Sequence, residues 1–431
     1  MSQDRPTRRR VPLPRDEQTV TVDGFTHGGE GVARLEGKAV FVPGALPGER
    51  ITLRVVDDRK RWARADLVEV LEPSADRAGD DDPQRHVCGG CDLEHVMPEG
   101  QLRLKTRVVR EQLERLGGLT DPPVTDGLAV GPATGYRNRA RFHVGPDGRL
   151  GFFAPGSHDV LPAESCRALA PDVLAVVDEI GSTSAAEVTV RAHGDTRAVV
   201  LKPGPGGLEV PDGDFHLLLE QPDGSTVAMR GDGVLTEEVA GHRYRFAATA
   251  FFQNNTAGAE ALVREVLHAC GDVPGMVGSG DISGALVWDL YAGVGLLSLP
   301  LAAAGAEVVA VEGHEEAAEW AGRNAADAGL TLQVEAIGVH PFLRAARKGD
   351  GPADPPDVVV LDPPRTGAGE DAVTDLLALS PATIVYVACD PAALARDAKA
   401  LVAGGYRLTA AQPLDLFPMT HHVETVATFT R

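Results

Sequence analysis

The chain has 431 residues, 43% of them hydrophobic, and a formal net charge of -21. The acidic charge excludes a generally basic nucleic-acid coat, and five cysteines are too few to indicate a disulfide scaffold. No apolar run approaches the roughly 20 residues of a membrane-spanning helix, and no signal-peptide core is visible. The sequence therefore predicts a cytoplasmic protein of two to four domains, with no membrane and no obligate protein partner.

The first domain is predicted to be a small β-barrel. Residues 1–15 are charged and proline-rich, which is typical of a disordered tail. Residues 16–74 contain five short strand patterns at regular spacing, as in a barrel of the oligonucleotide-binding type. Basic residues gather at 59–64 and again at 103–110. Most such clusters are solvated surface, but several in one part of an acidic chain favour a polyanionic substrate.

Residues 75–245 are predicted to form a cysteine loop, a helix and a central antiparallel β domain. Cys88 and Cys91 are separated by two glycines, so both sulfurs can face one metal ion or cluster. The stretch from Gln101 to Leu116 has the period of an amphipathic helix with a basic face. Strand patterns follow from about 124 to 244, and Cys166 lies among them.

Residues 246–431 are predicted to form a doubly wound α/β domain. The stretch 286–312 has the pattern of one βαβ unit with a glycine turn after its first strand. Apolar runs recur at 358–361 and 384–388 with helical patterns between them, which indicates a parallel sheet. The glycine turn lets a ligand approach a helix N-terminus, and Glu312 at the end of the second strand suits a ribose. Ser298 replaces the third glycine of a dinucleotide fingerprint, so the spacing favours the S-adenosylmethionine fold over a nicotinamide site.

Polar residues follow the apolar runs of this domain. Asp362 follows the run 358–361, and Cys389 follows the run 384–388. The carboxyl ends of parallel strands form the ligand crevice of open α/β sheets, which makes Cys389 a candidate nucleophile. An isolated cysteine there is more often inert, and its thiol needs a helix N-terminus or a base to ionise.

Taken together, these residues resemble the bacterial uracil-C5 RNA methyltransferase family, which makes 5-methyluridine in tRNA and 23S rRNA. The resemblance covers nearly the whole chain. It implies a Rossmann-like class I methyltransferase domain behind an N-terminal TRAM domain, a small RNA-binding barrel. The segments that carry it are, in order, H-G-G-E-G, V-P-G-A-L-P-G-E, C-G-G-C, Y-R-N-R-A-R-F, F-F-Q-N-N, D-L-Y-A-G-V-G, D-P-P-R, Y-V-A-C-D-P and F-P-M-T-H-H-V-E-T-V.

The resemblance also implies roles for single residues. Cys389 would be the nucleophile that adds to carbon 6 of uracil, and Glu424 the base that removes the proton from carbon 5. The target uridine would have to leave its stack to reach them. The RNA would be gripped by the barrel and the basic helix. The residues implied to bind S-adenosylmethionine are Gln253, Tyr291, Glu312 and Asp362.

A 4Fe–4S cluster is a further expectation with two open interpretations. Family members with a cluster carry a cysteine six residues before the C-x-x-C pair, where this chain has Asp82. One interpretation is a cluster held by Cys88, Cys91 and Cys166 with Asp82 or His86 as fourth ligand. The other is a lost cluster, since such a site normally takes four thiolates. Its role would be structural, because methyl transfer moves no electrons.

Three other functions are compatible with parts of the sequence. A non-catalytic RNA-binding protein on a methyltransferase scaffold is the main alternative, but every residue implied in the chemistry is present. A redox enzyme using the cysteine loop is disfavoured by the missing fourth thiolate. Cytosine methylation shares the cysteine chemistry, but the D-P-P-R and H-V-E phrases favour uracil.

Overall fold

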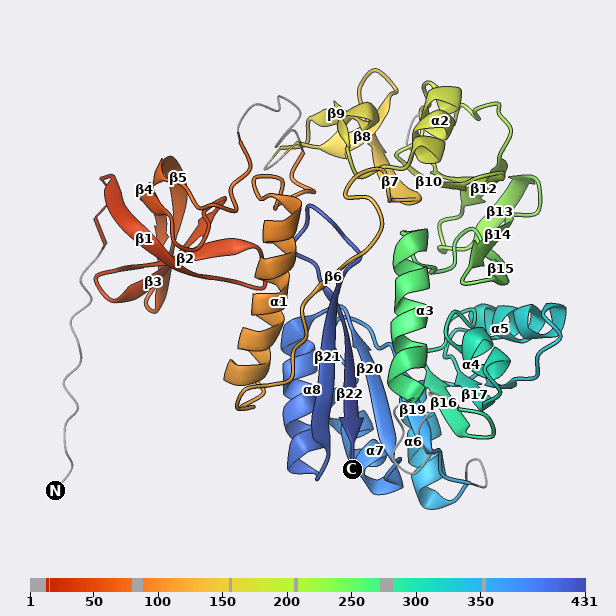
Figure 1. The fold of residues 1–431 in the computed structure, drawn as a ribbon. Coiled ribbons are helices and arrows are strands. Elements are labelled where there is room, and N and C mark those ends of the chain that lie inside the picture. Colours follow the sequence, from red (N-terminus) through yellow and green to blue (C-terminus); the bar gives the residue numbers. More distant parts are fainter. Residues whose placement is uncertain are drawn as a thin grey trace.

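The computed structural model describes residues 13–14, 16–79, 88–154, 157–204, 208–271, 282–350 and 354–431. An N-terminal barrel, a central β region and a C-terminal α/β unit follow one another along the chain (Figure 1). The predicted disordered tail lies outside the described residues except for 13 and 14, and Leu13 is buried in the barrel core. Asp82 and His86 also lie outside the described residues.

The N-terminal barrel closes as the strand patterns predict. Val40 and Val42 are fully buried while their neighbours are partly exposed, which follows from the two-residue period of a strand. The turn between the first two strands lies at one end of the barrel. The turn between the last two strands of the barrel lies at the other end, because β3 (Lys38–Pro43) and β5 (Trp62–Glu72) run parallel. The strands, in their order around the barrel, are β1 (Gln18–Phe25), β2 (Glu30–Leu35), β3 (Lys38–Pro43), β5 (Trp62–Glu72) and β4 (Arg50–Asp58).

Helix α1 (Pro98–Arg115) confirms the predicted helix and begins three residues earlier than expected. Proline at its first position fits there because the amide it lacks has no partner in the first turn of a helix. Its buried residues recur at a helical spacing and include Leu104, Val108 and Val109. The helix packs on α8 (Pro391–Ala403) and β21 (Arg407–Asp415), so it lies against the C-terminal sheet (Figure 1).

The central region contains a seven-stranded sheet covered by α2 (Pro171–Ile180). Its strand pairs are antiparallel as expected except for β11 and β12, which are parallel and joined by a long connection. The hairpin of β14 (Val234–Val239) and β15 (His242–Ala247) forms a separate sheet, whose side chains join the core of the C-terminal unit. The seven strands in order are β13 (Thr226–Arg230), β12 (His216–Glu220), β11 (Thr196–Lys202), β10 (Glu187–His193), β7 (Arg139–Val144), β8 (Leu150–Phe153) and β9 (Val160–Pro162).

The C-terminal unit is the predicted doubly wound sheet. Its strand residues alternate between two hydrophobic cores, with Val287 and Val385 in one and Trp288 and Tyr386 in the other. β22 runs antiparallel to β20. Among the described residues, no helix combines the length and apolar character needed to cross a bilayer. The strands in order are β18 (Gln333–Glu335), β17 (Glu307–Val311), β16 (Leu286–Leu290), β19 (Val358–Leu361), β20 (Thr383–Ala388), β22 (Glu424–Thr430), β21 and β6 (Leu128–Ala129).

Helices cover both faces of this sheet, so it is buried on both sides. One face is covered by α3 (Thr256–Gly271), α4 (Ser298–Ala303) and α5 (Glu315–Asp327). The opposite face is covered by α1, α6 (Val339–Lys348), α7 (Gly369–Leu379) and α8.

Candidate active site

The glycine turn after β16 has the shape expected of a ligand-binding turn. Tyr291, Gly293 and Gly295 all have positive φ, at 66°, 57° and 93°, and a tyrosine in that region marks a constrained backbone at a functional site. The Glu312 carboxylate accepts hydrogen bonds from the amides of Gly293 (2.8 Å) and His314 (2.7 Å). The acid at the end of β17 therefore faces the turn after β16.

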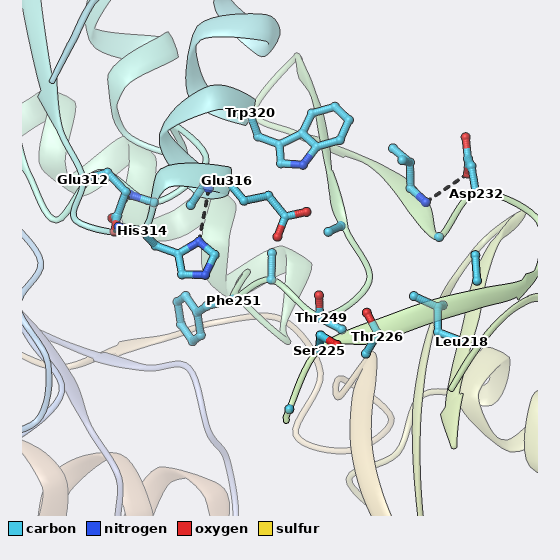
Figure 2. Close-up of a pocket in the computed structure, with 18 of the residues that line it drawn as sticks. Leu218, Ser225, Thr226, Asp232, Thr249, Phe251, Glu312, His314, Glu316 and Trp320 are labelled. Carbon is cyan, nitrogen blue, oxygen red and sulfur yellow. Dashed lines mark hydrogen bonds between the residues drawn. The ribbon is translucent and has the colours of Figure 1, made fainter. Parts of the chain in front are cut away.

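The four residues implied to bind the cofactor line two adjoining cavities. Gln253, Tyr291 and Asp362 line a small cavity of about 40 Å³. Tyr291, Glu312 and Asp362 also line a cleft of about 840 Å³. In Figure 2, Glu312 and Trp320 lie on the methyltransferase side of this cleft, and the strands of the central region form its other side.

The loop that carries Gln253 is fixed from the central region. Arg191 on β10 is buried and donates hydrogen bonds to the carbonyls of Phe252 (3.0 Å) and Gln253 (3.1 Å). Its guanidinium also lies over the Phe246 ring, 4.7 Å from the ring centroid. Phe251 of the same loop is 71% exposed and lines both cavities. Figure 2 shows its ring in the larger cleft, below His314.

Asp362 is half-buried beside these cavities and lies near two buried acids, Asp289 and Glu424. Burial raises the pKa of Asp289 to about 7 and that of Asp362 to about 7. Burial and the charge of Asp362 also raise the pKa of Glu424 well above its usual value. Within the described residues, Asp289 Oδ1 and Glu424 Oε1 are buried without a hydrogen-bond partner. Arg365 offsets part of the shift at Glu424. Buried acids that lack hydrogen-bond partners are costly to ionise, so the cluster fits a positively charged ligand such as a sulfonium.

Cys389 and Glu424 come together because β20 and β22 pair. Ala388 lies opposite Thr425 in the register, which places the two predicted catalytic residues at the same end of neighbouring strands. Burial, together with Glu424 and then Asp362, raises the pKa of Cys389 to about 12. Cys389 also precedes the N-terminus of α8, but that helix end does not offset burial and the two acids.

A third cavity, of about 120 Å³, opens at Cys389. It is lined by Arg365, His421 and His422 from the methyltransferase domain and by His27 from the turn between β1 and β2. Burial first, and then the neighbouring His421 and Arg365, lower the pKa of His422 to about 4. The barrel therefore reaches the catalytic end of the sheet.

The predicted cluster ligands do not form a metal site within the described residues. Burial, neighbouring carboxylates and the nearby thiols of Cys166 and Cys88 raise the pKa of Cys91 to about 12. No group of three or more Cys, His, Asp or Glu side chains in the described ranges has the arrangement of a metal site. The predicted fourth ligands, Asp82 and His86, lie outside the described residues, so the cluster stays a prediction.

Comparison with known proteins shows the family of this chain. Residues 13–68 match the TRAM domain family, and residues 355–431 match the family tRNA (Uracil-5-)-methyltransferase. The 23S rRNA (uracil(1939)-C(5))-methyltransferase RlmD of Alkalilimnicola ehrlichii is 36% identical over 459 residues, covering 98% of this chain and 99% of that protein. An uncharacterized RNA methyltransferase of Streptomyces avermitilis is 37% identical, covering 96% of this chain and 98% of that protein.

The chain belongs to the uracil-C5 RNA methyltransferase family. A crystal structure of Pyrococcus abyssi tRNA (uracil-54, C5)-methyltransferase in complex with S-adenosyl-L-homocysteine has the same fold. Its TM-score is 0.73 at 24% identity, over 96% of this chain and all of that chain. This chain is an S-adenosylmethionine-dependent RNA (uracil-5-)-methyltransferase with an N-terminal TRAM domain.

The structure adds site residues to which the sequence assigned no role. Asp289 joins the acidic cluster, and Phe251 and Trp320 line the cleft. The position of Asp289 at a strand end was a usable signal. No sequence signal linked His27 to the site, because only the folded barrel places its turn beside Cys389.

Proposed function

We propose that this uracil-C5 methyltransferase works through a covalent adduct between Cys389 Sγ and carbon 6 of uracil, resolved by Glu424. The observation that carries the proposal is the pairing of β20 with β22. It places a thiol and an unpaired buried carboxyl at the same edge of the sheet, beside the cavities that Asp362 lines.

The chemistry follows from the two side chains. Cys389 gives its proton to solvent in the cavity that opens at its side chain as the C–S bond to carbon 6 forms, and the electron pair of the uracil double bond moves toward the carbonyl at carbon 4. The enolate carbon 5 then takes a methyl group. Glu424 accepts the proton from carbon 5, the double bond re-forms, and the Cys389 thiolate leaves. S-adenosylmethionine supplies an electrophilic methyl group and a positive charge on sulfur.

The acidic cluster gives these steps an order. A cation beside Asp289, Asp362 and Glu424 lowers their pKa values, since an opposite charge favours the ionised form. Glu424 is then a carboxylate before methyl transfer. Transfer removes the positive charge, so the pKa of Glu424 rises again when it must accept the proton. A base with a raised pKa holds that proton more strongly.

We infer that the hairpin between β4 and β5 binds a flanking part of the RNA. Arg59, Lys60, Arg61 and Trp62 are all exposed and line a hollow of about 380 Å³. Trp62 also lies against Phe41, with ring centroids 6.0 Å apart. Cations beside an exposed aromatic ring suit phosphates and a stacked base.

This hairpin lies at the end of the barrel away from His27, which lines the cavity at Cys389. A six-residue strand such as β2 spans about 20 Å. The RNA substrate must therefore extend about 20 Å or more from the target uridine to reach both sites. That length favours a structured RNA over a mononucleotide or a very short oligonucleotide.

Mass spectrometry of nucleosides tests the proposed reaction and names the RNA. We would delete the gene, restore it as wild type or as Cys389→Ala, and digest tRNA and rRNA separately. 5-Methyluridine should disappear from one RNA class and return only with the wild-type gene. An unchanged content in every class, or restoration by Cys389→Ala, would contradict the proposal.

A further inference from the structure

The segment 416–423 joins β21 to β22 and leads directly into Glu424. Its backbone is constrained at Met419, where φ is 65°, a region that residues with large side chains rarely adopt. Such a conformation persists only where the surroundings over-determine it. The contacts that fix this segment come largely from residues about 300 positions earlier in the chain.

Gln101 on α1 is the centre of these contacts. Its Oε1 accepts a hydrogen bond from the amide of Met419 at 2.7 Å. Its Nε2 donates to the carbonyls of Leu93 (3.1 Å) and Val96 (2.9 Å). The Leu93 amide in turn donates to the Met419 carbonyl at 2.8 Å. Both backbone groups of Met419 are therefore held, by Gln101 and by the loop that follows the C-x-x-C pair.

Lys105 holds the start of the same segment. Its ammonium donates to Asp415 Oδ1 (2.5 Å) and to the Phe417 carbonyl (3.0 Å), and its side chain is only 2% exposed. The sequence placed Lys105 on the basic face of a helix that grips RNA. That expectation is wrong for this residue, because burial against Asp415 gives it an intramolecular partner and removes it from the surface.

The second half of the segment is held by two further residues. The Tyr136 hydroxyl donates to the Pro418 carbonyl at 3.1 Å. Asp92 accepts from the His421 amide at 2.7 Å and also bonds the His421 ring. The barrel closes over the same point, since a side chain at Gly29 would come within 3.0 Å of His421 Cβ. The residues that hold this segment can therefore influence the position of Glu424 without contacting the uracil.

We propose that Gln101 is a positioning residue for Glu424 and acts by fixing the backbone at Met419. Its loss would remove the partner of the Val96 carbonyl and of the Met419 amide and one of the two donors to the Leu93 carbonyl, which favours rearrangement of the segment. A displacement of about 1 Å from a reacting geometry costs up to about 100-fold in rate. The inference rests on the proposed role of Glu424, and it predicts a defect in adduct resolution rather than in cofactor binding.

The test compares Gln101→Met with Gln112→Met. Methionine keeps the volume and the helix propensity of glutamine but removes its hydrogen bonds. Gln112 is half-buried on the same helix, about 16 Å further along its axis. Each protein is incubated with S-adenosylmethionine labelled in its methyl group and total RNA from the deletion strain. Turnover, cofactor affinity and labelled protein–RNA adduct on a denaturing gel are then measured.

We expect Gln101→Met to lose about 10- to 100-fold in turnover, to bind S-adenosylmethionine within about twofold of wild type, and to accumulate adduct. Gln112→Met should behave as wild type. Reduced turnover without adduct, or unchanged turnover, would overturn the proposal. If Gln101→Met does not fold, Tyr136→Phe tests the proposal in its place. It removes the hydrogen bond to the Pro418 carbonyl and should show the same pattern more weakly.

The variant Glu424→Gln is analysed on the same gel, which separates the positioning role of Gln101 from the assignment of Glu424 as the base. If it forms adduct while the Gln101 and Tyr136 variants do not, the positioning role is wrong and the base assignment stands. If Glu424→Gln itself forms none, the base assignment fails, and with it the ground of this inference.

Discussion

The two halves of the active site are built differently. In the predicted cofactor half, Tyr291, Glu312 and Asp362 follow the parallel strands β16, β17 and β19, and only the loop of Gln253 is held from outside the sheet, by Arg191. In the predicted catalytic half, Cys389 and Glu424 lie at paired strand ends, but their surroundings come from loops far apart in the chain, including the barrel turn at His27. The first half is positioned by local topology, and the second depends on long-range contacts.

This difference has a mechanistic consequence. A site on strand ends is rigid, so cofactor affinity should survive changes in the loops around it. The catalytic half is held by Gln101, Lys105 and Asp92 through hydrogen bonds across the domain boundary. Changes there should impair catalysis while the cofactor still binds. The predictions below separate the two halves, beginning with the largest expected effect.

Cys389→Ala should remove catalysis and spare the cofactor half. Without the thiol, carbon 5 of uracil is too weak a nucleophile, so we expect turnover to fall by at least about 1000-fold, in the range for loss of a covalent nucleophile. The affinity for S-adenosylmethionine, measured by calorimetry, should stay within about twofold. Cys270→Ala, which changes a buried cysteine on α3, is the control. Loss of cofactor binding in Cys389→Ala would mean that the two halves are not separate.

Trp62→Ala should weaken RNA binding without affecting the cofactor half or the catalytic half of the site. Stacking of a base on an aromatic ring is worth about 1–3 kcal/mol, which corresponds to roughly 5- to 150-fold in the dissociation constant for RNA. Turnover at saturating RNA should be unchanged, so KM for RNA rises alone. Lys60→Ala should have a smaller effect and reduce the salt dependence of binding. A fall in turnover at saturating RNA for Trp62→Ala would contradict a role limited to docking.

The acidic cluster predicts how cofactor affinity depends on pH. Asp289 and Asp362 have pKa values of about 7 in the protein without ligand, and a cationic ligand lowers them, so binding releases protons. Affinity for S-adenosylmethionine should therefore rise from pH 6 to pH 8, by up to about tenfold for each carboxyl that ionises, and level off above. S-adenosylhomocysteine, whose sulfur is neutral, should show a weaker dependence. Calorimetry in two buffers of different ionisation enthalpy measures the released protons, and proton uptake would refute the account.

The same contrast explains what the sequence could and could not predict. The barrel, the doubly wound sheet and the strand-end residues were predictable, because hydrophobic period and turn residues are local. The hydrogen bonds of Gln101 to Met419 were not, since they join residues 318 positions apart. Lys105 was misjudged for the same reason, because its partner Asp415 is equally remote. The domain boundaries at 16–74, 75–245 and 246–431 and the catalytic roles stay predictions.

Peptide mass spectrometry of Glu424→Gln tests the central claim most directly. The variant is incubated with S-adenosylmethionine and RNA from the deletion strain, and the products are digested with nuclease and protease. The account predicts a peptide that contains Cys389 and carries a methylated uridine, because addition and methyl transfer precede the step that Glu424 performs. Free 5-methyluridine at the wild-type rate, or an adduct on another cysteine, would contradict it.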